Sequence, residues 1–413
     1  MIYKQLKDLV KSVNIKNTDG KVKRVIGVSI SKNFIPSVAN LNGVDLTKYN
    51  LIKKNQFACK LMSVGRDLQL PIDLYKEESL ALISSAYYVF EVINENIILP
   101  DYLNMWFRRS ETDRWVGYIS GGDVRGGISW EMFLEMKVNV PPIEEQRQIV
   151  AQYQSIANKI KVNEQICEKL EAVAQALYKH WFVDFDFPYS LPSEGGPQDG
   201  VAIEKPYKSS GGKMVWNEEL GKEIPEGWEV GKLKNIIYYS NTKISLRELT
   251  SQNYISTESM LADKRGVDFI SNVPEGNNVS EFIEGDILIS NIRPYLKKIW
   301  FADINGGCSN DVLCLRSKEP VFQFFALNIL FNDQFFDYVM QGAKGTKMPR
   351  GDKDWILDYK ILLPSVSVLE FYSKEIQLVN KVKKLKTKQN QKLTQLQSLL
   401  LSRLAVGEEV EAS

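Results

Sequence analysis

The sequence predicts an α+β protein: two similar mixed α/β domains separated by two long antiparallel coiled-coil helices, with an internal pseudo-two-fold repeat. Two observations predict this class. Residues 141–184 and 364–405 each begin with proline after a strand-like run and continue as a long helical pattern. The segments leading into them, Phe133–Pro141 and Ile356–Pro364, align without gaps. The chain is therefore a duplication of one unit, and two copies are too few for an array of small stacked repeats.

The first long helix is predicted over residues 141–184. Pro141 and Pro142 end an extended run, and Glu144 and Glu145 follow in the first turn, where negative charge suits the helix dipole. Its apolar seam recurs at alternating steps of four and three: Ile149, Tyr153, Ile156, Ile160, Asn163, Cys167, Leu170, Ala174, Leu177 and Trp181. At 1.5 Å per residue this helix would be roughly 55–60 Å long, so it needs a long partner helix.

The second long helix, residues 364–405, supplies that partner and is followed by a short tail, residues 406–413. Its first stripe consists of Leu369, Tyr372, Ile376 and Val379. After a slip in register we expect the stripe to continue through Val382, Leu385, Gln389, Leu393, Leu396 and Leu400. This helix lacks the paired glutamates that open the first one.

Residues 1–140 are predicted to form the first domain. Short β-rich runs at 25–30, 57–62 and 86–93 alternate with turn residues, and one helix is expected over 100–109. A glycine-rich loop, 117–129, precedes the last strand.

Residues 185–222, rich in Pro, Gly and Ser, are predicted to be a linker. The second domain, residues 223–363, repeats the order of the first. A single helix over 321–340 is expected before a second flexible loop, 341–354, and a final strand.

Composition is that of an ordinary globular protein, with 44% hydrophobic and 25% charged residues. No apolar run is long enough to cross a membrane, and the first residues do not resemble a signal peptide. Four cysteines without a CxxC pair favour a reduced, cytoplasmic protein.

The formal net charge of +1 is low for a protein that binds nucleic acid by bulk electrostatics alone. Between Glu375 and Glu408, however, the chain has several lysines and no acidic residue. Either the partner is not nucleic acid, or the basic residues act locally with help from other subunits. A solvated helix face is an equally good interpretation of the lysines.

Catalytic machinery is not apparent. The one histidine, His180, stands among aromatic residues, where packing is more probable than acid–base work. No GxxxxGK[ST] loop is present. A nuclease-like set of Asp101, Glu135 and Lys137 exists, but Glu135-x-Lys137 recurs as Asp358-x-Lys360 at the same place in the second copy, which favours a structural repeat. We therefore expect no catalytic residue, no metal site and no cofactor.

The two glycine-rich loops are better candidates for function, because loops on a rigid scaffold commonly carry recognition. Arginine and lysine contact phosphates and guanine edges, and glycine lets a backbone approach closely. The candidate DNA-binding residues in these loops are Arg125, Lys344, Lys347 and Arg350. Other candidates along the chain are Lys32, Arg66, Arg108, Arg109 and Arg293. Each one alone could equally be an ordinary surface charge. The phenylalanines between 322 and 336 recur at helical spacing, which favours core packing over base stacking.

Five motifs occur in a fixed order along the chain: PPIEEQRQIV (Pro141–Val150), LYKHWFVDFDFP (Leu177–Pro188), EIPEGWEVGKL (Glu223–Leu233), GDILIS (Gly285–Ser290) and the second proline-initiated helix after Leu363. Their order and spacing, which are more specific than any one of them, resemble the specificity subunit of type I restriction–modification systems. The resemblance spans essentially the whole chain.

The resemblance implies a non-catalytic subunit that binds double-stranded DNA. Each globular half would be a target-recognition domain reading one part of a split, asymmetric DNA target. The long helices would act as spacer and as the docking site for two modification (adenine methyltransferase) subunits, and ATP-dependent restriction subunits can join such a complex. The alternative is a coiled-coil scaffold whose two globular halves bind proteins rather than DNA.

Overall fold

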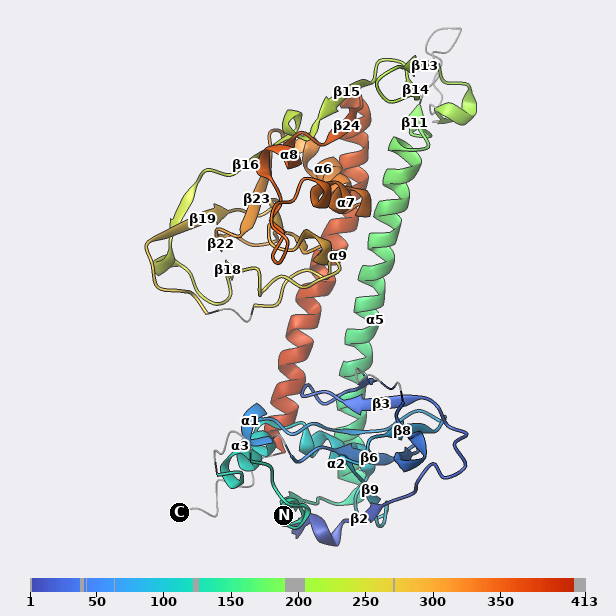
Figure 1. The fold of residues 1–413 in the computed structure, drawn as a ribbon, viewed down its shortest axis with the longest axis vertical. Helices are drawn as coiled ribbons and strands as arrows, with labels where there is room; N and C mark the ends of the chain where they lie inside the picture. The colour runs from blue at the N-terminus through green and yellow to red at the C-terminus, as the bar shows by residue number, and fades with distance from the viewer. Residues whose placement is uncertain are drawn as a thin grey trace. The chain divides into compact units, whose positions relative to one another are not determined.

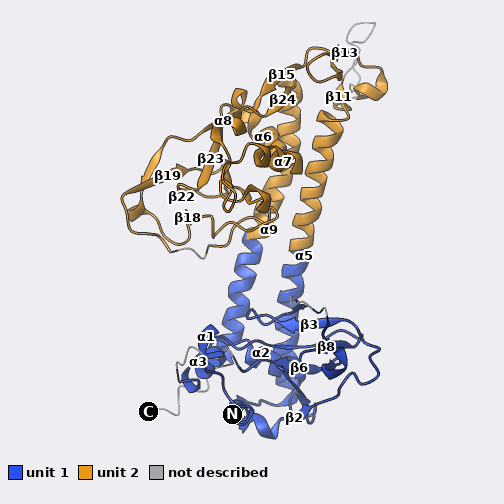
Figure 2. Cartoon of the chain, in the orientation of Figure 1, with its two compact units in different colours: residues 1–163, 388–413 blue, residues 164–387 orange. Residues whose placement is uncertain are grey.

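A computed structural model of the chain describes residues 2–37, 41, 43–62, 64–121, 126–189, 205–269 and 272–404. The fold consists of two compact units (Figure 2). Unit 1 comprises Met1–Asn163 with Lys388–Ser413, and unit 2 comprises Glu164–Thr387. The two predicted long helices are present as α5 (Ile143–Phe182) and α9 (Val366–Arg403), and each contributes residues to both units.

The described part of unit 1 consists of short strands and short helices beside its parts of α5 and α9 (Figure 1). Its strands are β1 (Tyr3–Gln5), β2 (Val10–Val13), β3 (Val25–Val28), β4 (Phe34–Pro36), β5 (Asn50–Ile52), β6 (Gln56–Cys59), β7 (Ile72–Leu74), β8 (Ala81–Ile83), β9 (Tyr88–Val92) and β10 (Lys137–Asn139). Its helices besides α5 and α9 are α1 (Val64–Asp67), α2 (Pro100–Phe107), α3 (Ser110–Ile119) and α4 (Trp130–Leu134).

Unit 2 repeats this composition after two short strand pairs (Figure 1). Those pairs are β11 (Pro188–Tyr189) with β12 (Lys205–Pro206) and β13 (Met214–Asn217) with β14 (Lys222–Pro225). The remaining strands are β15 (Glu229–Lys232), β16 (Ile237–Tyr239), β17 (Lys243–Ser245), β18 (Tyr254–Ile255), β19 (Asn278–Phe282), β20 (Ile287–Ser290), β21 (Ile299–Phe301), β22 (Gly306–Cys308), β23 (Val312–Ser317) and β24 (Lys360–Leu363). The helices are α6 (Gln323–Leu330), α7 (Asp333–Gln341) and α8 (Lys353–Leu357).

The two units share one sheet topology, which supports the predicted duplication. One sheet has the order β2-β9-β6-β7 in unit 1 and β16-β23-β20-β21 in unit 2. In the other sheet, β8 pairs parallel with β3 and antiparallel with β5, and β22 pairs in the same way with β18 and β19. Only the fourth strand differs, because β4 pairs with β3, whereas β17 pairs with β19, the equivalent of β5.

The repeat holds residue for residue where the sequences align. Helices α4 and α8 begin and end at aligned positions, and β10 and β24 begin at aligned positions. Ser129 caps α4 by accepting the Met132 N–H at 3.2 Å, and Asp352, at the aligned position, accepts the Trp355 N–H at 3.2 Å. An oxygen-bearing side chain is needed at both positions because the first N–H groups of a helix lack intrahelical partners.

The predicted single helix over 321–340 is wrong, because the structure has two helices, α6 and α7. Asn332 separates them and caps α7 by accepting the Gln334 N–H at 3.0 Å. In the first copy, α3 extends to Ile119, so the glycine-rich loop begins three residues later than Gly117. A glycine within a helical pattern is tolerated where the surrounding packing supports the helix.

Helices α5 and α9 run antiparallel and contact each other within each unit. In unit 1, Asn163 donates from Nδ2 to Gln389 Oε1 at 3.1 Å and to Asn390 Oδ1 at 2.7 Å. In unit 2, Lys383 forms an ion pair with Glu171, and Trp181 packs on the Tyr372 ring. Residues early in α5 thus meet residues late in α9, as the sequence predicts.

The predicted register slip in α9 is wrong. Leu385 and Leu396, placed in the seam by that slip, are 60% and 48% exposed. The buried and half-buried face instead keeps one unbroken alternation of three and four from Leu369 to Leu404, through Lys383, Lys386 and Asn390. Lys383 and Asn390 are tolerated in the seam because Glu171 and Asn163 on α5 pair with them. The pattern of apolar residues alone therefore could not reveal the register.

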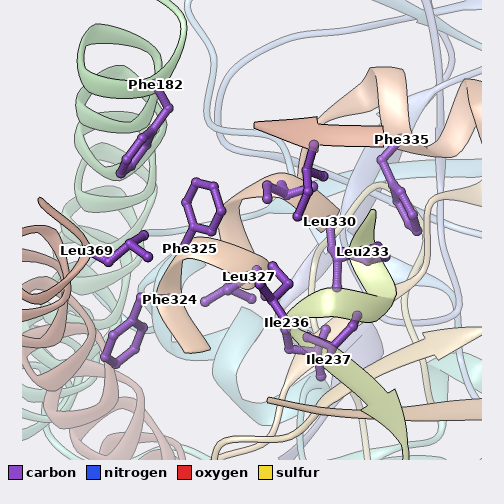
Figure 3. Close-up of a cluster of buried hydrophobic side chains, with 14 of the residues drawn as sticks. Phe182, Leu233, Ile236, Ile237, Phe324, Phe325, Leu327, Leu330, Phe335 and Leu369 are labelled. Atoms are coloured by element: carbon purple, nitrogen blue, oxygen red, sulfur yellow. The ribbon is translucent and has the colours of Figure 1, made fainter. Parts of the chain in front are cut away.

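The core of unit 2 joins both long helices to the sheet. Figure 3 shows Phe182 of α5, Phe325 of α6 and Leu369 of α9 turned toward one another. The rings of Phe182 and Phe325 meet edge to face with centroids 4.8 Å apart. The segment expected to be a linker contributes as well, because Phe187 stacks between Tyr207 and Trp228. Residues 190–204 lie outside the described residues.

Candidate nucleic-acid interface

In unit 2, two loops that are distant in the sequence are joined by backbone hydrogen bonds. We call them the unit 2 platform: residues 291–298, between β20 and β21, and residues 342–352, between α7 and α8. Arg293 donates its N–H to Pro349 O at 2.8 Å, and Gly351 donates to Asn291 O at 3.2 Å. The structure therefore brings Arg293 together with the loop of Lys344, Lys347 and Arg350, which are four of the predicted site residues.

Unit 1 has an equivalent arrangement, the unit 1 platform, formed by the described residues between β6 and β7 (60–62 and 64–71) and between α3 and α4 (120–121 and 126–129). Gly65 donates its N–H to Gly126 O at 3.0 Å, and Ile128 donates to Leu61 O at 3.2 Å. Gly126 aligns with Pro349 and Ile128 with Gly351, so two bonds of the same directions join the corresponding loops, although their partners in the first loop are four residues apart in unit 1 and two apart in unit 2.

Glycine is required at one point of the unit 1 platform. A Cβ on Gly127 would lie 2.6 Å from Leu61 O and 2.7 Å from Met62 Cα. Both contacts are with backbone atoms, so no side-chain rotation could relieve them. Glycine is predicted from the sequence to let the backbone approach a ligand closely; at Gly127 it instead lets one loop of the platform approach the other.

Three cations of the unit 2 platform are neutralised by acidic side chains. Lys344 Nζ lies 2.6 Å from Asp352 Oδ2, and this contact lowers the pKa of Asp352. Arg350 Nη1 lies 3.0 Å from Asp311 Oδ1, and Lys297 Nζ lies 2.9 Å from Asp333 Oδ1. Asp311 and Asp333 could not be assigned from sequence, because they are far from their partners along the chain.

Arg293 and Lys347 differ from these three cations. Both side chains are exposed, and neither has an ion pair or a side-chain hydrogen bond with the residues that the structure describes. The charge of Arg293 acts on another cation, Lys298, whose Nζ donates to Thr257 O at 2.7 Å. Burial lowers the pKa of Lys298; the charge of Glu258 acts against this, and the charge of Arg293 adds a smaller lowering. The exposed guanidinium of Arg293 is thus available to an anionic or electron-rich ligand.

Three of the predicted site residues in unit 1 are tied into its fold. Lys32 is 6% exposed and donates from Nζ to Phe107 O at 2.7 Å and to Asp113 Oδ2 at 2.8 Å. Burial lowers its pKa. Arg108 Nη2 donates to Asp73 Oδ1 at 2.8 Å. Arg109 is 1% exposed, with its guanidinium 3.7 Å from the centre of the Trp106 ring. These contacts give all three a structural role.

Arg66 is the predicted residue that lies on the unit 1 platform, next to Gly65. Its exposed guanidinium pairs with Asp67, Nε to Oδ1 at 2.7 Å, and this contact raises the pKa of Arg66. Arg125 lies outside the described residues. The described residues contain no cluster of His, Cys, Asp and Glu suited to hold a metal ion. Within them, no helix is long and apolar enough to cross a membrane.

Comparisons with known proteins all find similarity to one kind of protein. Residues 7–172 match the family described as the type I restriction modification DNA specificity domain. The MjaIX specificity subunit of Methanocaldococcus jannaschii is 24% identical over 334 residues, covering 77% of this chain and 71% of that protein. The HindI specificity subunit of Haemophilus influenzae is 33% identical over 128 residues, covering 30% of this chain and 27% of that protein.

A crystal structure of a type I restriction–modification S subunit from M. genitalium shares the fold. Its TM-score is 0.51 at 13% identity, and the match covers 98% of this chain and 95% of that one. The fold agrees with the sequence matches, and both make this chain similar to type I restriction–modification specificity subunits.

Proposed function

We propose that this chain selects the DNA on which a type I restriction–modification complex acts, with residues 1–140 and 223–363 each reading one part of a split target. The carrying observation is the repeated platform. Two loops are joined by two backbone bonds of the same directions in each unit, but the side chains on them differ. Two copies of one scaffold with different side chains suit two different half-targets, so the complete target is asymmetric.

The chain itself is a non-catalytic subunit, and partners supply the chemistry. Two adenine methyltransferase subunits dock on the long helices in this proposal, and restriction subunits can join them. Support comes from large apolar side chains exposed on α9, Leu378 and Leu385 in unit 2 and Leu396 and Leu399 in unit 1. Exposed apolar side chains commonly mark protein–protein contacts. Because the substrate is cellular DNA, we place the complex in the cytoplasm.

A salt titration of DNA binding tests the proposed function. The complex of this chain with its methyltransferase subunits should bind duplex DNA with an affinity that falls steeply as salt is added. A plot of the logarithm of the binding constant against the logarithm of the salt concentration should be linear, with a slope of about −0.9 for each phosphate contacted. The chain without other subunits should neither methylate nor cleave the same DNA. An affinity that does not change with salt, or sequence-independent methylation by the complex, would favour the alternative, a scaffold that binds proteins.

A further inference from the structure

The unit 2 platform presents one arginine in an unusual backbone conformation. Arg293 has φ 51° and ψ 63°, in the left-handed region that side chains other than glycine rarely adopt. Pro294 follows it at the start of a short 3-10 helix, Pro294–Leu296. Such a conformation costs free energy and persists only where neighbouring contacts enforce it.

Those contacts are present on both sides of Arg293. Its N–H is bonded to Pro349 O at 2.8 Å, and its carbonyl oxygen accepts the Leu296 N–H at 2.9 Å. Ile292, the preceding residue, forms a bridge with Arg350. The backbone is thus fixed on both sides, while the guanidinium remains exposed. A side chain projecting from a fixed backbone meets a ligand at a defined position.

The electrostatic surroundings leave the Arg293 guanidinium available. The cations at 297, 344 and 350 pair with carboxylates, whereas Arg293 has no ion pair with the described residues and is close enough to Lys298 for the two charges to repel. A DNA ligand would remove no ion pair of Arg293 and would relieve its repulsion from Lys298. Lys347, also exposed, lies in the middle of its loop. Its single flexible ammonium suits a phosphate rather than a base edge.

We propose that Arg293 determines specificity in unit 2 by donating two hydrogen bonds to O6 and N7 of a guanine in the major groove, with Lys347 on a neighbouring phosphate. This inference rests on the proposed function. Guanine is favoured over the other bases because its major-groove edge offers two adjacent acceptors that match the planar guanidinium fork. A fixed backbone favours a base contact over a phosphate contact, since base reading requires the donor to be placed accurately.

The test is selection of binding sites from a random duplex DNA library by the complex of this chain with its methyltransferase subunits. Wild type should enrich a two-part motif with a guanine in the part that depends on residues 223–363. Arg293→Ala should lose the preference for that guanine about ten-fold or more and leave every other position unchanged. Arg293→Gln should shift the same position toward adenine, because the glutamine amide pairs with N6 and N7 of adenine.

Two further variants give matched comparisons. Lys347→Ala should weaken binding to all sequences and leave the motif intact. Arg247→Ala removes an exposed arginine of the same unit that lies outside the platform, and it should change neither affinity nor motif beyond two-fold. The melting temperature of each variant shows whether its fold is kept.

The outcomes separate this inference from the proposed function. A wild-type complex that enriches no sequence would overturn both. If wild type enriches a two-part motif and Arg293→Ala and Arg293→Gln enrich the same motif, this inference alone is overturned. Uniform weakening by the Arg293 variants, with an unchanged motif, would also overturn it, because Arg293 would then contact a phosphate.

Discussion

Arg293 donates its backbone N–H to the carbonyl oxygen of Pro349 at 2.8 Å, and this bond has a counterpart between Gly65 and Gly126. In unit 1 the bond joins the loop after β6 to the loop before α4, and in unit 2 it joins the loop after β20 to the loop before α8. Duplication has therefore preserved the junction of two loops, while the residues presented there have diverged. Several measurable consequences follow from this junction and from the contacts around it.

Substitution of Gly127 tests the unit 1 platform. Gly127→Ala should force the two loops apart, because the new Cβ would overlap backbone atoms of Leu61 and Met62. We expect a cost of about 1–3 kcal/mol and a loss of selectivity for the part of the target read by residues 1–140. Thermal unfolding and methylation-site mapping measure the two effects.

The matched control is Gly117→Ala, in α3. There a Cβ would lie 3.6 Å from Leu68 Cδ2, an ordinary contact. Alanine is also the better helix former by about 1 kcal/mol. Stability should therefore hold or rise, with unchanged selectivity. Equal behaviour of the two alanine variants would contradict the close approach of the loops.

Lys32 should contribute to stability and not to sequence reading. Lys32→Ala removes the hydrogen bonds to Phe107 O and Asp113 and leaves that carboxylate without its cation, at a cost of about 3 kcal/mol. Lys21→Ala, which removes an exposed lysine paired with Asp19, should change stability by less than about 0.5 kcal/mol. The melting temperature measures both. A Lys32→Ala variant with wild-type stability and an altered DNA motif would contradict the structural role and show that Lys32 takes part in reading DNA.

Asn163 should hold the register of α5 against α9 in unit 1. Its side chain is 0% exposed and donates to Gln389 and Asn390. Asn163→Leu leaves those two amides without their donor and should cost about 1–3 kcal/mol. The double variant Asn163→Leu/Asn390→Leu should recover stability, because an apolar pair then replaces a polar one.

Val162→Ala is the neighbouring control, since Val162 is exposed on α5, and it should change stability by about 0.5 kcal/mol or less. Chemical denaturation of the full chain measures all three variants. A single Asn163→Leu variant more stable than wild type would show that the polar layer does not support the helix pair.

Sequence reasoning reached the repeat and the helices because both depend on local pattern. The aligned segments ending at Pro141 and Pro364 identify the duplication, and alternating steps of three and four identify the seam of α5. The seam of α9 could not be traced beyond Val379, because Lys383 and Asn390 occupy the next seam positions and pair there with Glu171 and Asn163 of α5. Long-range contacts of this kind leave no local signal.

The candidate site was predictable in part for the same reason. Residue type pointed to Arg293 and Lys347, which are exposed, but equally to Lys32 and Arg109, which are buried. Residue type alone cannot distinguish a basic side chain that reads DNA from one that is tied into the core. The distinction lies in partners such as Asp113, whose position depends on the tertiary fold.

The central claim, that each globular half reads its own part of the target, is tested most directly by exchanging one half. Residues 1–140 would be replaced by the equivalent segment of a related specificity subunit, and methylated sites of the resulting complex mapped on genomic DNA. We expect one part of the split target to change to that of the donor, while the part read by residues 223–363 stays the same. A change in both parts, or in neither, would contradict the account.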